Sequence, residues 1–168
     1  MLTNRQKRKI SLELIFCGLI MIGVYTVFNL FVGLAIIHGS SMNPTLQDGS
    51  VIIMNKQTTN LEYGDIVIIN ENVYGKELIK RVIGKEGDII DIDFETGIVT
   101  RNGTPLDEPY TNTPTNKGYD VKFPITVEKD CIFVMGDNRN DSVDSRSSQV
   151  GCIPLTCIEG VYLWTIRK

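Results

Sequence analysis

The stretch Leu14–Ile37, LIFCGLIMIGVYTVFNLFVGLAII, contains no charged side chain and separates two parts of the chain that differ in character. As a helix, 24 residues would extend about 36 Å, which is enough to cross a hydrocarbon core of about 30 Å. We therefore expect a single transmembrane helix over residues 12–37, after a short basic segment, 1–11, and before one domain, 38–168. A chain of 168 residues has room for an anchor and one domain of ordinary size.

Basic residues lie on one side of this apolar stretch. Arg5, Lys7, Arg8 and Lys9 precede it, whereas residues 38–47 contain no lysine or arginine. The positive-inside rule then places the N-terminus in the cytoplasm and residues 38–168 on the extracytoplasmic face of the cell membrane. A cleavable secretory signal is the alternative, but its apolar region runs about 7 to 15 residues and ends at a small-x-small site. Since this stretch is longer and ends in Ile36-Ile37, we favour a permanent anchor in the lipid bilayer.

Beyond residue 37 the long apolar run gives way to short β-branched segments separated by turn residues, which predicts a mainly β domain built on an antiparallel sheet. Asn102-Gly103 is a strong two-residue hairpin signal. Residues 107–118 contain two prolines and are typical of an exposed loop, at the tip of a small β extension over about 88–129. The expected strands are Ser50–Met54, Asp65–Asn70, Glu77–Ile83, Asp88–Asp93, Gly97–Arg101, Phe123–Val127, Cys131–Met135 and Glu159–Ile166.

Charge and cysteine usage exclude two classes of protein. The net charge is -3, and lysine and arginine do not cluster beyond the first residues, so we expect no nucleic-acid partner. The only histidine is His38, and the cysteines show neither a C-x-x-C pair nor zinc-ligand spacing, so we expect no metal and no cofactor. Cys152 and Cys157 are near enough in sequence to close a small loop, which spacing does not establish. We expect free thiols at Cys17, Cys131, Cys152 and Cys157.

A serine and a lysine in the outer domain suggest nucleophilic chemistry. A serine hydroxyl is a poor nucleophile until a base, usually histidine, takes its proton. His38 lies three residues before Ser41, with no acidic residue nearby to orient it, so a Ser-His-Asp triad is disfavoured. A lysine can replace histidine if apolar burial keeps it neutral. In an extended segment Lys80 shares one face with Leu78 and Val82, which provides apolar neighbours.

Each of these features also has a simpler interpretation. A lone lysine on an edge strand usually keeps its amine in water. The sequence around Ser41 could be an ordinary turn in which Asn43-Pro44 breaks the chain. The polar run 137–146 is by default a solvated loop.

Taken together, these segments resemble the bacterial type I signal peptidases. Residues 41–45, Ser-Met-Asn-Pro-Thr, match the family signature S-M-x-P-T, and a Lys-Arg-Val-Ile-Gly segment follows at 80–84. Residues 136–146 match G-D-N-R-x-x-S-x-D-S-R, and residues 64–67 match the strand G-D-[IV]-[VI]. The resemblance covers nearly the whole chain. It implies a membrane-bound serine endopeptidase that removes signal peptides, with small residues at positions -1 and -3, from exported preproteins.

The same resemblance implies residue roles. Ser41 would be the nucleophile and, through its backbone N–H, an oxyanion donor, and Lys80 would be the general base. Ser142 would hydrogen-bond the lysine amine and orient it. Ion pairs that hold the third segment against the lysine strand would come from Arg81, Asp137, Asp144 and Arg146. Shallow substrate pockets would be lined by Ile37, Gly39, Met42, Leu46, Leu78 and Ile79.

One position leaves the mechanism open. Some family members carry a serine two residues before the nucleophile that donates to the oxyanion, and here that position is Gly39. Glycine at this position and the short β extension resemble the Gram-positive branch. The second oxyanion donor is therefore not assigned by the sequence.

Two other functions deserve comparison. A signal-peptidase-like accessory protein for pilus or surface-protein assembly would share the anchor and the fold without proteolysis. It would tolerate loss of Ser41 or Lys80, and the chain keeps both, along with Ser142 and Asp144. A self-cleaving repressor also pairs serine with lysine, but it requires a DNA-binding domain where this chain has an apolar span.

Overall fold

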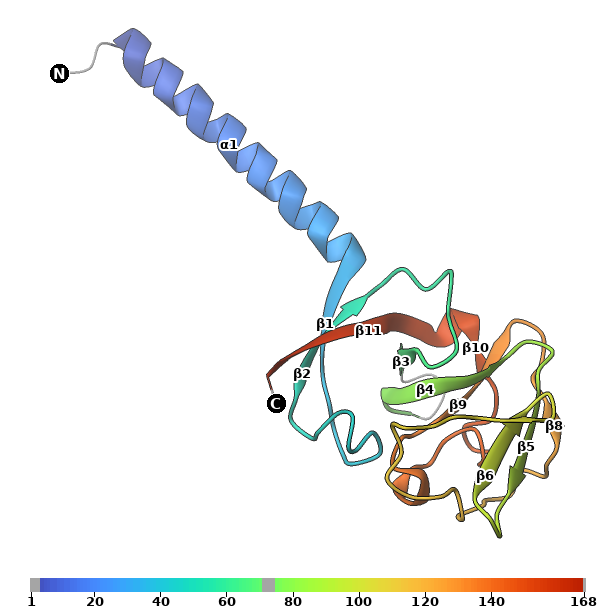
Figure 1. Ribbon diagram of the computed structural model, residues 1–168. Helices are drawn as coiled ribbons and strands as arrows, with labels where there is room; N and C mark the ends of the chain where they lie inside the picture. The colour runs from blue at the N-terminus through green and yellow to red at the C-terminus, as the bar shows by residue number, and fades with distance from the viewer. Residues whose placement is uncertain (1–3, 71–74, 168) are drawn as a thin grey trace. The chain divides into compact units, whose positions relative to one another are not determined.

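A long helix precedes a β-rich domain in the computed structural model, which describes residues 4–70 and 75–167 (Figure 1). Helix α1 is Asn4–Phe31. Within it, the 19 residues Glu13–Phe31 have a mean hydropathy of 2.2 and are long and apolar enough to cross a membrane. The chain divides into two compact units, with the division between Val32 and Gly33.

The helix ends earlier than the apolar stretch, which corrects the expected boundary at residue 37. Residues Val32–Ile36 form strand β1, with Gly33 and Ala35 buried and Leu34 and Ile36 exposed. Gly33 packs closely against β2: a Cβ on it would lie 2.5 Å from the end of the Met54 side chain, which would have to shift. Since all five residues are apolar or glycine, this two-residue alternation was hidden in an unbroken apolar run. The span of 19 residues still extends about 28 Å as a helix.

The main sheet has seven strands in the order β1-β2-β11-β3-β4-β9-β10. Its further members are β2 Val51–Asn55, β3 Ile66–Ile69, β4 Leu78–Lys85, β9 Cys131–Met135, β10 Ile153–Pro154 and β11 Ile158–Arg167. The recorded pairings from β2 through β10 are antiparallel. The predicted mainly β, antiparallel fold is therefore confirmed. The sequence did not indicate β1 or the two-residue strand β10.

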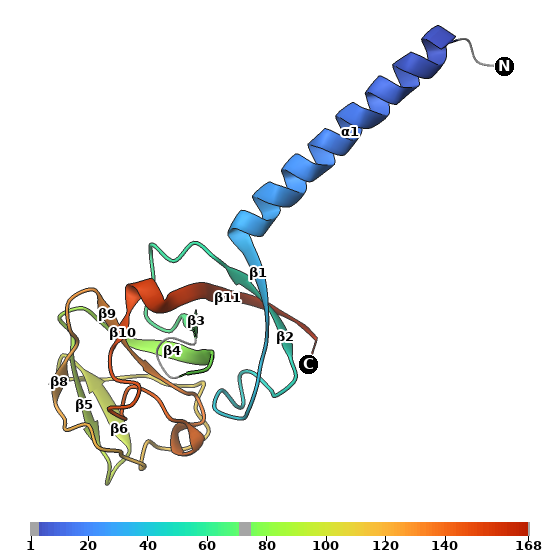
Figure 2. The same ribbon diagram turned by 180° about the vertical axis from the view of Figure 1, so that it is seen from behind.

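A second, four-stranded sheet with the order β7-β6-β5-β8 forms the β extension. Its strands are β5 Ile89–Asp93, β6 Ile98–Arg101, β7 Thr104–Pro105 and β8 Ile125–Thr126. Asn102 and Gly103 both have positive φ and join β6 to β7, as the hairpin signal predicted. In Figures 1 and 2 β5, β6 and β8 lie at one end of the domain and β1 and β2 at the other.

Apolar side chains cover both faces of the central strands. Alternate residues of β3 enter different clusters: Ile66 and Ile68 pack with Met42 and Leu46, while Val67 and Ile69 pack with the cluster that contains Leu78 and Val82. All four residues of β3 are buried, which explains their continuous β-branched sequence. A third cluster joins the small sheet to β9 through Ile90, Val99 and Phe133, among others. The extension therefore shares its core with the main sheet.

Candidate active site

The first signature, residues 41–45, forms a tight turn between β1 and β2. The backbone N–H of Asn43 donates to the Ser40 carbonyl at 3.0 Å, and that of Leu46 donates to the Met42 carbonyl at 2.9 Å. Met42 and Leu46 are buried in the cluster beneath the turn, so they fix it to the sheet. Gly39 has φ +90°, a conformation that favours glycine, and its N–H donates to Asp48 at 2.8 Å. The Ser41 side chain is thereby held in one place.

Lys80 lies in the middle of β4 and reaches the serine. Its Nζ donates to Ser41 Oγ at 2.8 Å and to the Ile79 carbonyl oxygen at 3.0 Å. The residue is 3% exposed and lies opposite Val67 in the sheet, on the face that Leu78 and Val82 also occupy. Burial lowers the pKa of Lys80 to about 8, against smaller opposing effects such as the charge of Asp144. A neutral amine is therefore accessible near physiological pH.

Arg81, the next residue of β4, lies on the opposite face of the strand from Lys80 and connects the three segments. Its guanidinium donates to both carboxylate oxygens of Asp137, at 2.7 and 2.6 Å, and to the Gly64 carbonyl at 2.7 Å. Asp137 in turn accepts a hydrogen bond from the Thr45 hydroxyl. A planar, bidentate pair of this kind fixes orientation as well as distance. The lysine strand, the serine turn and the third segment thus meet at Asp137.

Asp144 and Arg146 are fully buried and pair at 2.8 Å, but within their own loop. Asp144 also accepts the Gly136 N–H at 3.0 Å, and Arg146 donates to the Arg139 carbonyl at 2.6 Å. We expected all four charged residues to hold this loop against the lysine strand. Arg81 with Asp137 does so, whereas Asp144 with Arg146 braces the loop internally because the two side chains, two residues apart, face each other.

The hydrogen bonding of Ser142 differs from what we expected. Its hydroxyl is buried and has no hydrogen-bond partner among the described residues, so the expected bond to Lys80 is not formed. Lys80 instead bonds Ser41 and its neighbouring carbonyl. Ser142 is nevertheless close to the nucleophile: a Cβ on Gly136 would lie 2.2 Å from Ser142 Oγ and 2.5 Å from the Ser41 carbonyl oxygen. Glycine at position 136 allows this close approach.

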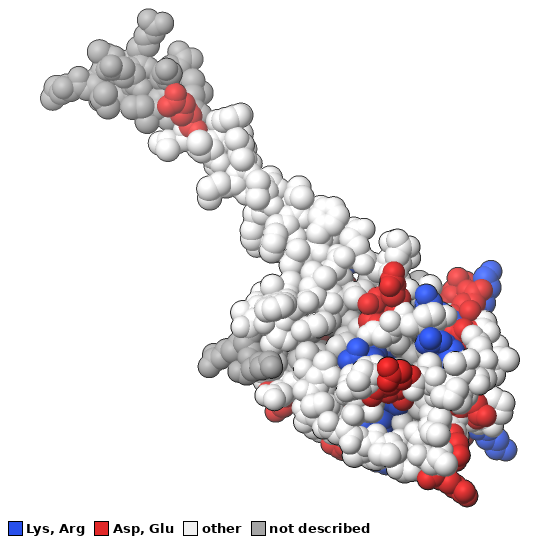
Figure 3. Space-filling view, viewed as in Figure 1, with Lys and Arg blue, Asp and Glu red and all other residues white. Residues whose placement is uncertain are grey.

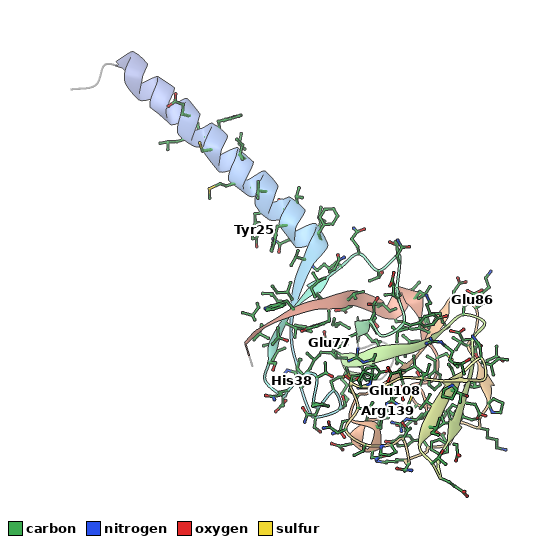
Figure 4. All side chains as sticks on the ribbon, in the orientation of Figure 1. Tyr25, His38, Glu77, Glu86, Glu108 and Arg139 are labelled. Carbon is green, nitrogen blue, oxygen red and sulfur yellow. The ribbon has the colours of Figure 1, made fainter. Side chains whose placement is uncertain are left out.

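A cleft of about 400 Å³ opens beside Ser41 and Lys80. Five of the six expected substrate-binding residues line it: Ile37, Gly39, Met42, Leu78 and Ile79. Leu46 does not, because its side chain is 2% exposed and packs beneath the turn. The polar part of the cleft lining includes His38 and Glu77, which Figure 4 labels. The pKa of Glu77 is raised, chiefly by burial and also by Glu159, while His38 lowers it.

Sequence reasoning missed a set of contacts made by the loop after β7. Glu108 and Arg139 form a bidentate ion pair, with distances of 2.5 and 2.7 Å, and lie side by side in Figure 4. The Tyr110 ring lies 4.0 Å from the guanidinium carbon of Arg81, and burial, followed by the charge of Glu108, raises the pKa of its hydroxyl. The loop therefore folds back onto the motif. Arg139 was visible in the third signature, but nothing in the sequence marked Glu108 or Tyr110 as its neighbours.

Within residues 4–70 and 75–167 no group of three or more His, Cys, Asp and Glu side chains is placed to hold a metal ion. Figure 3 shows that basic and acidic side chains are intermixed on the visible face of the domain.

Comparison with known proteins gives consistent results. The profile described as "Signal peptidase, peptidase S26" matches residues 9–166. Signal peptidase I of Bacillus amyloliquefaciens is 39% identical over 67% of this chain and 62% of its own length. Signal peptidase I P of Bacillus subtilis subsp. natto is 37% identical over 67% of this chain and 64% of its own length. The matches thus span less than two thirds of these two relatives.

A third relative is matched over more of its length. Signal peptidase I U of Bacillus subtilis strain 168 is 32% identical over 87% of this chain and 82% of its own length. Among solved structures, a signal peptidase I from Enterococcus faecalis V583 superposes with a TM-score of 0.52 at 26% identity. That superposition covers 61% of this chain and 97% of the solved one.

Proposed function

Because this chain belongs to the signal peptidase family, peptidase S26, we propose that it is a membrane-bound serine endopeptidase that removes signal peptides from exported preproteins. The observation that carries the proposal is the 2.8 Å hydrogen bond between Lys80 Nζ and Ser41 Oγ, with the lysine buried among apolar side chains. A serine beside a lysine whose pKa is lowered to about 8 has the two parts of an activated nucleophile. A protein that only assists assembly has no use for a buried lysine at a serine hydroxyl.

The proposed reaction proceeds in two halves. Neutral Lys80 takes the proton of Ser41, and the serine oxygen attacks the carbonyl carbon of the scissile peptide to give a tetrahedral intermediate. Collapse of that intermediate breaks the C–N bond, and the lysine proton passes to the departing amine of the mature protein. The signal peptide remains as an ester on Ser41. A water then gives a proton to Lys80 and attacks the ester carbonyl carbon. As the ester C–O bond breaks, Lys80 returns that proton to the Ser41 oxygen, which restores both residues and releases the signal peptide with a free carboxyl group.

The cleft suits a substrate with small residues near the cut. Ile37, Leu78 and Ile79 contribute apolar surface, and Met42 closes the cleft next to the serine. Apolar side chains beside the nucleophile would favour small apolar residues next to the scissile bond. We assign these residues, with Gly39, to recognition of the positions -1 and -3, and we leave Leu46 out because it is buried in the core.

The proposed location is the extracytoplasmic face of the cell membrane, with the N-terminus in the cytoplasm. The basic residues before the apolar span support this direction. An exposed apolar surface on the domain supports contact with lipid: Leu34 and Ile36 on β1, and Leu163, Trp164 and Ile166 on β11, are all exposed. Since β1 begins one residue after α1 ends, its exposed side chains lie within a few residues of the span.

Cleavage of a preprotein that carries an Ala-x-Ala site tests the proposal. The purified full chain in detergent should release the mature protein, whereas Ser41→Ala and Lys80→Ala should each abolish cleavage while the domain stays folded. The double variant should be about as inactive as either single one, because the two residues act as a unit. His38→Ala should retain most activity. Normal cleavage by Lys80→Ala would refute the proposed base.

A further inference from the structure

One residue of the third segment holds both carbonyl groups beside the nucleophile. The side-chain Nδ2 of Asn138 donates to the Ser40 carbonyl oxygen at 3.1 Å, and the Asn138 backbone N–H donates to the Ser41 carbonyl oxygen at 3.0 Å. The Ser40 oxygen also accepts the N–H of Asn43 at 3.0 Å. Its two lone pairs are therefore both occupied, and its direction is fixed.

The fixed carbonyl also sets the direction of the next N–H. The Ser40 C=O and the Ser41 N–H belong to one peptide unit, and the cis bonds of the described residues are elsewhere, at Asn43–Pro44 and Phe123–Pro124. In a trans peptide the C=O and the N–H point in opposite directions. With the Ser40 oxygen held against Asn138, the Ser41 N–H points away from the third segment. It donates to no residue that the structure describes, and Ser40 and Ser41 both line the cleft.

We infer that Asn138 is a positioning residue, which aims the Ser41 backbone N–H into the cleft as a donor to the oxyanion of the tetrahedral intermediate; the inference rests on the proposed function. Donors that are already aligned where negative charge develops contribute more than donors that must reorient. Asn138 is not among the residues that line the cleft and does not hydrogen-bond Lys80. It acts through the Ser40–Ser41 peptide.

Asn138 is itself well fixed for this task. It follows Asp137, whose carboxylate is bound by Arg81 at 2.7 and 2.6 Å. It precedes the short 3-10 helix Arg139–Asp141, and its carbonyl accepts the Asp141 N–H at 2.9 Å. Asp141 also accepts the Ser40 hydroxyl at 2.5 Å, a second link between the third segment and the serine turn. The position of Asn138 is thus fixed by contacts of the residues before it and after it in the chain.

Asn138→Ala is the direct test, with kinetics on an Ala-x-Ala peptide. We expect kcat to fall about 10- to 100-fold, less than the roughly 10²- to 10³-fold typical of losing a donor outright, because the Asn43 bond to Ser40 remains. KM should stay within about twofold. The pH at which kcat/KM rises should not change, because Lys80 keeps its hydrogen-bond partners. A general loosening of the site would instead change the surroundings of Lys80 and shift this pH. Asn140→Ala is the matched control, since Asn140 contacts Thr113 and Pro114 instead.

A peptide aldehyde separates oxyanion binding from substrate binding. It forms a tetrahedral adduct on a serine hydroxyl, so its inhibition constant should rise in Asn138→Ala by the factor by which kcat/KM falls. In the Ser41→Ala background, adding Asn138→Ala should leave the affinity for the uncleaved peptide unchanged. Three results would overturn the inference: a loss of peptide affinity as large as the loss of kcat/KM, an unchanged inhibition constant for the aldehyde, or an unchanged kcat.

Two further comparisons keep the test decisive. Thermal melts report whether Asn138→Ala is folded, and Asn138→Asp, which keeps the shape of the side chain but not the donor, takes its place if it is not. Loss of kcat in the folded Asp variant supports the inference, and normal kcat refutes it. Failure of the proposed function is a separate result, because the unmodified chain would then fail to cleave the peptide at all.

Discussion

At the scale of single residues, the proposed chemistry depends on a lysine placed where its charged form is unfavourable. Asp144 and Asp137 raise the pKa of Lys80, and Lys76 and Arg146 lower it, but burial is the largest effect and determines the direction. The apolar residues Leu78 and Val82 on the same face of β4 cause that burial. Arg81 points to the other face and forms an ion pair with Asp137 at 2.6 Å. Two adjacent basic residues thus serve opposite purposes because a strand alternates its side chains.

The first prediction concerns pH and activity. Since the base must be neutral, kcat/KM should rise with pH through an apparent pKa of about 8. A histidine base would place the rise near 6.5 instead. A pH series of initial rates on the Ala-x-Ala peptide distinguishes the two, and a flat profile between about pH 7 and 10 would exclude the lysine mechanism.

A matching effect on stability follows from the same pKa. The pKa of Lys80 is about 8 in the folded chain and 10.5 ordinarily, so between these values the unfolded chain binds more protons and stability rises with pH. Lys80→Met should therefore stabilise the domain at pH 7, by on the order of 3 kcal/mol. This gain should shrink between about pH 8 and pH 10.5. Urea unfolding at both ends of that range is the measurement, and a gain independent of pH would contradict the assignment.

Ser142 gives the third residue-scale prediction. Its buried hydroxyl has no hydrogen-bond partner among residues 4–70 and 75–167, so the melting temperature of Ser142→Ala should stay the same or rise. If Ser142 orients Lys80 once substrate fills the cleft, kcat should fall while KM changes little. A destabilised variant would indicate a structural role, and an unchanged kcat would remove Ser142 from the mechanism.

At the scale of elements, the loop between β7 and β8 supports the site from outside the main sheet. Glu108 holds Arg139, whose Nε donates to the Gly136 carbonyl at 3.2 Å. Gly136 in turn lies against Ser41 and Ser142. Tyr110 covers Arg81 and lies 5.9 Å from the guanidinium carbon of Arg139. The small β extension therefore connects to the catalytic motif as well as to the core.

Glu108→Gln tests this connection. It leaves the Arg139 side chain, which is 1% exposed, without its carboxylate, and breaking a buried pair on one side is strongly destabilising. We expect a loss on the order of 2 kcal/mol, since Glu108 itself is partly exposed, together with reduced activity. Glu95→Gln is the control, because Glu95 is exposed on the same extension. Equal melting temperatures for the two variants would show that the ion pair does not support the site.

At the scale of the whole molecule, two apolar features indicate contact with a membrane. One is the apolar span of α1, and the other is the set of exposed apolar residues on β1 and β11. Leu34 is 65% exposed and Trp164 69% exposed, although both belong to strands of the main sheet. Strand β2 lies between β1 and β11 in the sheet, and its residue Ile53 is paired with Trp164. Tryptophan is enriched at membrane interfaces, where one part of the ring is in apolar surroundings and another is hydrated. We expect this surface to lie against lipid.

The proposed orientation predicts a protease-protection result. An epitope tag placed after Lys168 should be removed when protease is added to intact spheroplasts, and a tag before Met1 should survive until the membrane is permeabilised. The basic residues before the span give the physical reason, because they resist transfer across the membrane. The reverse pattern would place the domain in the cytoplasm and contradict the proposed access to exported preproteins.

The sequence by itself determined the features that depend on local patterns. The apolar span, most strands and the Asn102-Gly103 hairpin followed from hydrophobic period and turn chemistry, and Lys80 was expected between apolar neighbours. The order of the three signatures indicated the family. Each of these features depends on residues that are neighbours in sequence, so one chain is enough to detect them.

The tertiary structure decided what depends on distant contacts. Strand β1 was hidden in an apolar run. Its alternation of buried and exposed residues appears only in the folded sheet, where Gly33 packs against Met54. Three hydrogen bonds of the site join residues that are far apart in the chain: Lys80 to Ser41, Arg139 to Glu108, and Asn138 to the Ser40 carbonyl. The position of the Ser142 hydroxyl, which lies close to Gly136 and has no hydrogen-bond partner among the described residues, is likewise set by the folded loop. Sequence spacing carries no information about such contacts, since folding of the whole sheet is what brings the partners together.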